Sequence, residues 1–195
     1  GGTGTDILTF SDAETVVDAD FTNVTSVETY DSFAGASTIT LGPLATAAGI
    51  VTVLTGGTAA STVTIPATHT GDLTVTSEVA AETIAAAATY AGKLTVKTTA
   101  DLQTTDTLTG GAGTTDTLNI TATGTAMVAD DLDTVTLFEV VDFSFNGAIS
   151  LTSASEMIAT GKTMSYTGSG QTTGAVTLVL TETTDTTSAQ TVSLG

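Results

Sequence analysis

The chain has 195 residues, enough for one domain or two small ones, and its net charge is −18, from 21 acidic residues against three lysines. A nucleic-acid-binding surface needs clustered Lys and Arg, so this charge balance excludes nucleic acid as a partner, and the lack of cysteine excludes disulfides, thiolate metal sites and cysteine nucleophiles. About a quarter of the residues are Thr, which favours strands, and only 5% are aromatic, which favours a narrow core of Val, Leu and Ile.

The first nine residues, Gly1–Thr9, match the nonapeptide pattern G-G-x-G-x-D-x-U-x, in which U is a large apolar residue. The glycines permit a tight turn that directs main-chain carbonyl oxygens toward one point. Asp6 supplies the negatively charged oxygen that Ca²⁺ prefers. A near copy with one additional Thr occupies Gly110–Ile120, where Asp116 takes the place of Asp6. The alternative for both motifs is a plain Gly-rich turn that binds no ion.

Short β-branched segments follow at regular intervals along the chain. Asp6–Phe10 is predicted as the first strand and Val24–Asp31 as the second. Three further segments share one pattern, Gly49–Thr55, Gly71–Ser77 and Gly92–Thr98, and their glycines lie 71 − 49 = 22 and 92 − 71 = 21 residues apart. The remaining predicted strands are Thr62–Ile65, Thr83–Ala88, Thr107–Thr109, Gly147–Thr152, Thr163–Thr167, Gly174–Thr181 and Gln190–Leu194.

A period near 21 residues with glycine at the corners favours an all-β fold of the parallel β-helix or β-roll solenoid type, and a β-sandwich is the alternative. Strand side chains alternate between core and solvent, so the Thr neighbours of the core residues are expected to point outward. The residues predicted to form one narrow core are Leu8, Val53, Leu73, Val75, Leu94, Val96, Leu118 and Ile120.

The chain also contains a longer repeat. Four pairs of matching residues lie 109 to 111 positions apart: Gly1 and Gly110, Asp6 and Asp116, Glu28 and Glu139, and Asp31 and Asp142. Two single-residue insertions explain why the spacing grows from 109 to 111 residues. We therefore expect two related solenoid halves, 1–109 and 110–195, in one continuous domain. The C-terminal end followed by the N-terminal end resembles the internal sequence around the second motif. This predicts either a segment of a longer repeat chain or copies that stack head to tail.

The two glycine-rich motifs resemble the turns of the RTX (repeats-in-toxin) family of calcium-binding β-rolls and β-helices. The surrounding Thr-, Ala- and Gly-rich sequence is similar to bacterial S-layer proteins of the RTX type. The resemblance implies that Asp6 and Asp116 bind Ca²⁺ together with main-chain carbonyls near Gly1, Thr3, Gly111 and Gly113. It also implies ligands from an adjacent coil, and the acidic residues that recur in the duplication are the candidates: Glu28, Asp31, Glu139 and Asp142. The alternative role of these four is to provide charges that discourage aggregation at strand edges.

The secondary structure of two segments remains open from the sequence, and one isolated histidine needs a separate assignment. Glu78–Ala88 has good helix formers but also fits tight inward positions of a solenoid, and Ala126–Leu132 is a second candidate for a helical turn. His69, the only histidine, follows Pro66-Ala67-Thr68 and is expected to be a solvated loop residue, without a second histidine to form a zinc site.

No G-x-S-x-G or H-E-x-x-H motif occurs, so we expect no enzymatic activity. The leading interpretation is a calcium-stabilised structural domain of an extracellular, S-layer-like bacterial surface array. It would associate with itself, bind no nucleic acid and have no transmembrane segment, and contact with cell-surface polysaccharide is possible through other domains. The alternatives are a calcium-dependent adhesin or extracellular filament subunit, an accessory module of a secreted enzyme, and an ice-binding protein, which Thr-x-Thr pairs such as Thr62/Thr64 suggest.

Overall fold

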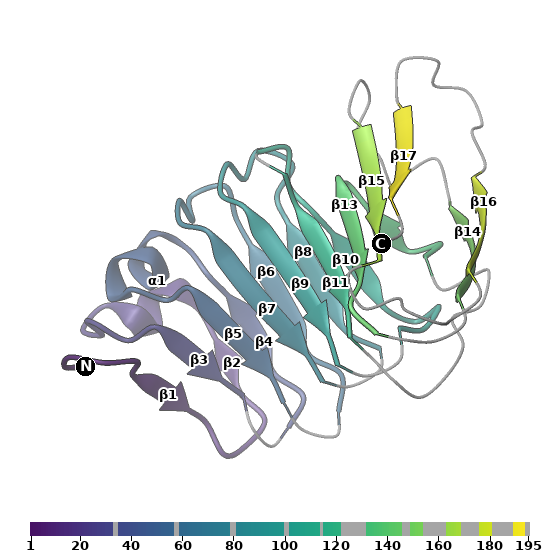
Figure 1. Cartoon of the computed structure of the whole chain (residues 1–195). Coiled ribbons are helices and arrows are strands. Elements are labelled where there is room, and N and C mark those ends of the chain that lie inside the picture. The colour runs from purple at the N-terminus through teal and green to yellow at the C-terminus, as the bar shows by residue number, and fades with distance from the viewer. Residues whose placement is uncertain are drawn as a thin grey trace.

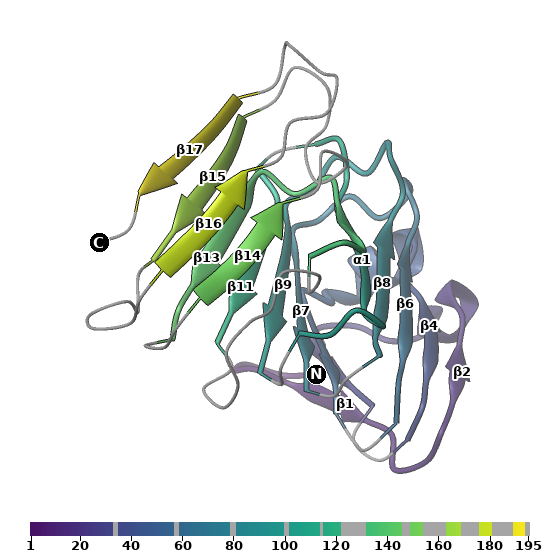
Figure 2. The same ribbon diagram turned by 90° about the vertical axis from the view of Figure 1, so that its right-hand side faces the viewer.

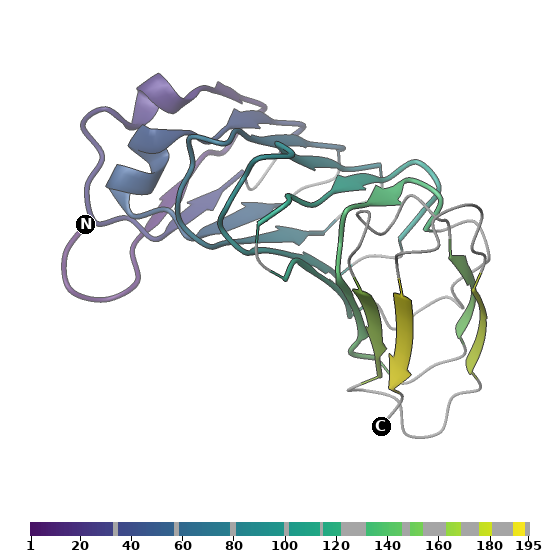
Figure 3. The same cartoon turned by 90° about the horizontal axis from the view of Figure 1, so that it is seen from above.

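The strands of this chain wind into a parallel β-solenoid (Figure 1). The computed structural model describes residues 1–32, 35–56, 59–78, 81–99, 102–113, 115–121, 132–145, 149–153, 163–168, 176–180 and 189–193. The N-terminus lies at one end of the solenoid and the later strands at the other, as the view from above also shows (Figure 3). Within the described residues, no helix is both long and apolar enough to cross a lipid bilayer.

One sheet, here called the long sheet, runs the length of the molecule. Its nine strands, in spatial order, are β1 (Ile7–Thr9), β3 (Thr29–Asp31), β5 (Thr52–Thr55), β7 (Leu73–Ser77), β9 (Leu94–Thr98), β11 (Thr117–Ile120), β13 (Val140–Phe143), β15 (Thr163–Thr167) and β17 (Ala189–Ser193). The pairing of β9 with β11 carries this sheet across the predicted boundary between the two halves at residue 110.

A second layer, here called the short sheet, has six strands in the order β12-β10-β8-β6-β4-β2. They are β2 (Thr15–Val16), β4 (Thr38–Thr40), β6 (Thr62–Ile65), β8 (Thr83–Ala86), β10 (Thr107–Thr109) and β12 (Val135–Thr136). Figure 2 shows β2, β4, β6 and β8 side by side in this layer. A separate pair, β14 (Ile149–Ser153) and β16 (Val176–Leu180), lies beyond β12 in the chain.

The connectivity identifies a solenoid. From β1 to β13, neighbouring strands are parallel and alternate between the two sheets along the chain, so each coil of this part contributes one strand to each layer. Paired residues in the long sheet are separated by 21 positions between β7 and β9 (Leu73 with Leu94) and by 26 between β15 and β17 (Thr163 with Ala189). The predicted solenoid is confirmed, and a sandwich of antiparallel hairpins does not fit parallel pairing.

The core lies between the two layers. Of the eight predicted core residues, seven are at most 2% exposed, and Leu8 in the first strand is partly buried against the core. Aromatic rings pack against each other at two places in the core. Phe21 packs edge-on against Tyr30 near the N-terminus, and Phe143 packs edge-on against Phe145 near β13. Most of the predicted strands occur within two residues of their expected limits.

The prediction of a single strand over Val24–Asp31 was wrong, because this block contains a corner of the solenoid. The matching block of the second half, Val135–Asp142, begins with β12 and contains a corner as well. Ser26 and Leu137, at matching positions of the two blocks, adopt φ values of 54° and 60°. This left-handed conformation is incompatible with a continuing strand, so it turns the chain from the short sheet toward the long sheet. Only the last part of each block joins the long sheet, as β3 and β13.

The helical segments lie elsewhere than the sequence suggested. Thr83–Ala86, inside the proposed helix at Glu78–Ala88, is the strand β8 with alternating burial. Of the second candidate, Ala126–Leu132, only Leu132 lies among the described residues. The helix α1 (Pro43–Ala48) begins with proline at its first turn and ends at Gly49, which has a φ of 102°. A 3₁₀ helix, η1 (Asp18–Phe21), packs against α1.

Candidate metal centre

The first predicted calcium turn closes on itself through Asp6. The Asp6 carboxylate accepts a hydrogen bond from Gly2 N at 2.6 Å, and Asp6 N donates to Glu28 Oε2 in the next coil at 2.8 Å. In return, Glu28 N donates to the Asp6 carbonyl oxygen at 3.2 Å. A Cβ atom on Gly1 would lie 1.6 Å from the Ser26 carbonyl oxygen, so only glycine fits there. We call this set of contacts the first clasp.

The second clasp repeats the first one with the matching residues of the second half. The Asp116 carboxylate accepts a hydrogen bond from Gly111 N at 2.6 Å, and Asp116 N donates to Glu139 Oε2 at 2.8 Å. Glu139 N donates to the Asp116 carbonyl oxygen at 3.2 Å. A Cβ atom on Gly110 would lie 2.2 Å from the carbonyl oxygen of Leu137, the counterpart of Ser26. The additional Thr before Asp116 therefore leaves the hydrogen bonds of the clasp intact.

The two clasps differ in burial. Asp6 and Glu28 are half-buried, whereas Asp116 is 0% and Glu139 only 8% exposed. Asp116 also accepts a hydrogen bond from Leu94 N in the preceding coil at 2.7 Å. Burial raises the pKa of Asp116 to about 6, although its two main-chain hydrogen bonds lower it, and the neighbouring Glu139 carboxylate adds to the rise.

One oxygen of the second clasp remains without a hydrogen bond. Glu139 Oε1 is buried and has no hydrogen-bond partner, while Glu139 Oε2 accepts from Asp116 N. Two buried carboxylates from adjacent coils therefore lie next to each other, with Lys93 as the cation that lowers the pKa of Asp116. This donor set suits a hard cation such as Ca²⁺, which binds carboxylate and carbonyl oxygens. A cation bound by Glu139 and Asp116 would compensate the repulsion between them.

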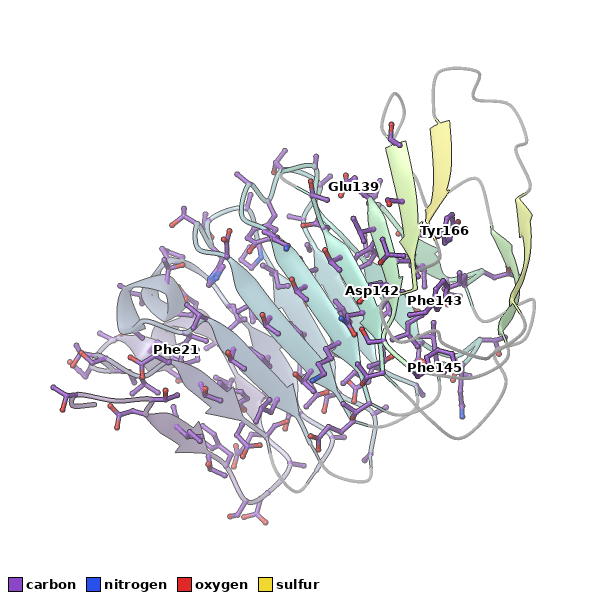
Figure 4. All side chains as sticks on the ribbon, in the orientation of Figure 1. Phe21, Glu139, Asp142, Phe143, Phe145 and Tyr166 are labelled. Carbon is purple, nitrogen blue, oxygen red and sulfur yellow. The ribbon has the colours of Figure 1, made fainter. Side chains whose placement is uncertain are left out.

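The other predicted ligands are placed differently. Asp31 and Asp142 follow the core residues Tyr30 and Val141 by one position, so they point out from the long sheet. Asp142 accepts hydrogen bonds from Asn119 Nδ2 at 3.1 Å, Ser144 Oγ at 2.6 Å and Thr167 Oγ1 at 2.5 Å. Figure 4 shows Glu139 near the start of β13 and Asp142 further along it.

The turn residues Thr3 and Gly113 complete the predicted set. Thr3 is exposed, and Gly113 is half-buried against the main chain of Ala91, which a Cβ atom would approach to 2.8 Å. The structure thus joins Asp6 with Glu28, and Asp116 with Glu139, and keeps Asp31 and Asp142 on the outer surface. Within the described residues, no group of three or more His, Cys, Asp and Glu side chains is placed to hold a metal ion.

Other acidic residues bind the main chain of neighbouring coils, which the sequence analysis did not foresee. Asp18 accepts hydrogen bonds from Gly42 N, Leu44 N and Ala45 N at the start of α1, at 2.8, 3.2 and 2.9 Å. Asp72 accepts from Lys93 N at 2.8 Å. No local sequence pattern signals these contacts, because they join residues 21 to 27 positions apart.

Two buried titratable residues were also missed. Glu82 is 0% exposed, and neither of its carboxylate oxygens makes a well-aligned hydrogen bond, although Ser61 N–H and the Thr55 hydroxyl lie near enough to lower its pKa. Burial outweighs them and raises the pKa of Glu82 to about 8. The prediction of a solvated His69 was wrong, because its ring is buried. His69 Nδ1 is 2.9 Å from Thr46 Oγ1 on α1, a helix that the sequence did not predict.

Comparisons with known proteins do not assign the chain to a family. No protein-family model matches the chain, and no curated protein or solved structure is significantly similar to it.

Proposed function

We propose that this chain is a structural, non-enzymatic segment of an extracellular bacterial surface array, similar to an S-layer, in which calcium stabilises the stacking of the coils. The single observation that supports this best is the second clasp. There, Asp116 and Glu139 bring two buried carboxylates together from adjacent coils, and Glu139 Oε1 lacks a hydrogen-bond partner. The half-buried pair of Asp6 and Glu28 repeats the arrangement near the N-terminus.

The two clasps would bind Ca²⁺ through side chains already held by the main chain. Asp116 and Glu139 would be the ligands in the second clasp and Asp6 and Glu28 in the first, with turn carbonyls near Gly1, Thr3, Gly111 and Gly113 as the further ligands implied by the RTX resemblance. Calcium would supply the positive charge that balances the two carboxylates. The role of the protein is to keep these carboxylates on adjacent coils, so that binding the ion also holds the coils together.

Calcium should raise the melting temperature, because only the folded chain brings each Asp next to its Glu. With affinities of roughly 10⁻⁴ to 10⁻³ M, as in extracellular modules, calcium at about ten times the dissociation constant should add about 1.4 kcal/mol per site. The measurement is thermal unfolding followed by circular dichroism, in calcium and in chelator. Identical curves in the two conditions would falsify the calcium proposal.

A matched pair of variants separates specific binding from screening of the net charge. Glu139→Gln keeps an oxygen that can accept from Asp116 N but removes the second buried charge. We expect it to be more stable than the unchanged chain in chelator and to lose part of the calcium response. Asp142→Asn, the control on the outer surface, should keep the full response. Equal responses of the two variants would argue for screening alone.

A filament or adhesin is the second candidate, and the sheet ends favour it. Within the described residues, β1 pairs only with β3 and β17 only with β15, so each end of the long sheet presents an edge strand. Such edges add further strands readily. Negative-stain imaging of the calcium-loaded protein distinguishes the candidates. Two-dimensional sheets support the array, fibres support the filament, and dispersed single particles at high concentration contradict both.

A further inference from the structure

The outer surface of the short sheet carries two regular columns of side chains. The parallel register places one residue of each column on every coil. The first column consists of Thr15, Thr38, Thr62, Thr83, Thr107 and Thr134, and the second of Val17, Thr40, Thr64, Ala85, Thr109 and Thr136. All twelve are exposed or half-exposed. The residues between the columns, Val16, Ile39, Val63, Ile84, Leu108 and Val135, are at most 4% exposed. We call the twelve outward residues the Thr face.

The composition of the Thr face departs from that of the chain. Ten of its twelve residues are Thr, whereas a share of about a quarter in the whole sequence gives an expectation of three. None of the twelve is charged, although the chain has a net charge of −18. The outward positions of the long sheet include Asp31, Lys97 and Asp142. Strand propensity alone therefore does not explain the Thr face, because the other sheet of the same solenoid mixes Thr with charges.

The backbone fixes the spacing of these side chains in two directions. Neighbouring strands lie about 4.8 Å apart, and alternate residues along one strand lie about 6.6 Å apart. Each Thr carries a hydroxyl and a methyl group, and its β-branch restricts rotation about χ1. The hydroxyl of Thr134 donates to the Asp106 carbonyl oxygen, so this residue contributes mainly its methyl group. Hydroxyls of neighbouring coils come within hydrogen-bonding distance, as Thr136 Oγ1 and Thr109 Oγ1 do at 3.1 Å. The result is an ordered, uncharged lattice of hydroxyl and methyl groups.

An ice surface has the complementary properties. It is an uncharged, two-dimensional lattice of water oxygens whose repeats are similar in size to the strand and residue spacings of the Thr face. Thr hydroxyls can take positions in such a lattice as donors and acceptors, and the methyl groups fill the spaces between them. Charged side chains order water around themselves and would disturb the match. We propose that the Thr face binds ice. This inference does not depend on calcium or on assembly.

The test is adsorption of the whole chain to ice. Partition into a growing ice phase and thermal hysteresis are measured for the unchanged protein, for Thr62→Lys in the middle of the Thr face, and for Thr74→Lys at a half-exposed outward position of the long sheet. We expect the unchanged protein and Thr74→Lys to bind ice and Thr62→Lys to lose binding, with far-UV spectra and melting temperatures of all three alike.

Three results would overturn the inference. The unchanged protein could show no adsorption and no hysteresis beyond that of an inert protein of the same size. The two Lys variants could lose adsorption equally while both remain folded. Finally, the Thr face could bind crystalline cellulose or chitin without affecting ice, which would assign it to a polysaccharide surface. A calcium-independent melting curve together with ice adsorption would contradict only the calcium proposal.

Discussion

Within the described residues, several carboxylates bind main-chain N–H groups of a neighbouring coil. Asp18, Asp72, Asp106, Asp116 and Glu139 each accept a hydrogen bond from the main chain of a neighbouring coil. A hydrogen bond to a charged acceptor is stronger than one between neutral groups. Part of the large negative charge therefore serves to join coils.

Replacement of Asp116 should be costly because its carboxylate accepts from Leu94 N and Gly111 N inside the molecule. Asp116→Ala would leave both buried donors without a partner, and we expect a loss of about 3 kcal/mol in the free energy of unfolding. The measurement is urea unfolding in chelator, which removes any contribution of calcium. Asp133→Ala, at an exposed turn position, is the control and should cost about 0.5 kcal/mol or less. Equal losses would contradict the structural role of the second clasp.

Glu82 should make the protein less stable as the pH rises. Its pKa is about 8 in the folded chain against an ordinary value of 4.5, so between these values the folded state keeps a proton that the unfolded state has released. Stability from this group is complete below about pH 4.5 and falls until about pH 8, by at most about 5 kcal/mol.

The comparison of the unchanged chain with Glu82→Gln isolates this effect, because other groups titrate in the same range. Burial raises the pKa of Asp31 and lowers that of His69, and both remain in the variant. We expect Glu82→Gln to gain stability relative to the unchanged chain as the pH rises, with the largest gain at pH 8. A difference that does not change with pH would show that Glu82 ionises normally in the folded state.

At the scale of elements, the corners decide the path of the chain. Ser26 is exposed and adopts a φ of 54°, a conformation that costs a non-glycine residue about 1 kcal/mol or more. Ser26→Gly should therefore stabilise the protein by about 0.5 to 1 kcal/mol, and Ser26→Val should destabilise it by more than about 1 kcal/mol. Thermal unfolding measures both changes. Destabilisation by glycine would mean that this corner is not strained.

The sequence predicted the strands better than the corners, for a physical reason. Alternation of Thr with Val, Leu or Ile is a local pattern, and it placed β6, β10 and β15 at their observed limits. The corner at Ser26 has no glycine to reveal the positive φ, so its β-branched neighbours resembled a strand. The hydrogen bonds of Asp18 to α1 join residues 24 to 27 positions apart, and no local pattern records such contacts.

The candidate site was likewise predictable only in part. The motif identified Asp6 and Asp116, and the duplication identified Glu28 and Glu139 as their partners across the coil. Because Glu28 and Asp31 both recur in the second half, the sequence made them equally good ligand candidates. Only the position of the strand distinguishes the two residues. Glu28 directly precedes β3, whereas Asp31 lies within it at an outward position. The burial of His69 and Glu82 depends on contacts between coils, which composition does not show.

At the scale of the whole molecule, the edge at β1 provides a test of self-association. Asp6 O and Phe10 N bond to β3, so residues 7 and 9 direct their main-chain groups away from it. Thr9→Pro would remove an outward donor without touching the pairing of β1 with β3. If copies add strands at this edge, the variant should sediment as a smaller species than the unchanged chain or Thr9→Ser. Identical sedimentation would exclude this edge as the contact.

The one-dimensional connectivity of the solenoid also sets its response to mechanical force. Partners in the long sheet are 21 to 26 residues apart, so each coil is held by the coils directly before and after it. A chain pulled from its two ends would give up coils one after another, starting where the hydrogen bonds between coils are weakest. Each released coil of about 22 residues would lengthen the extended chain by about 70 Å. A chain of such coils would extend in steps under load rather than unfold all at once.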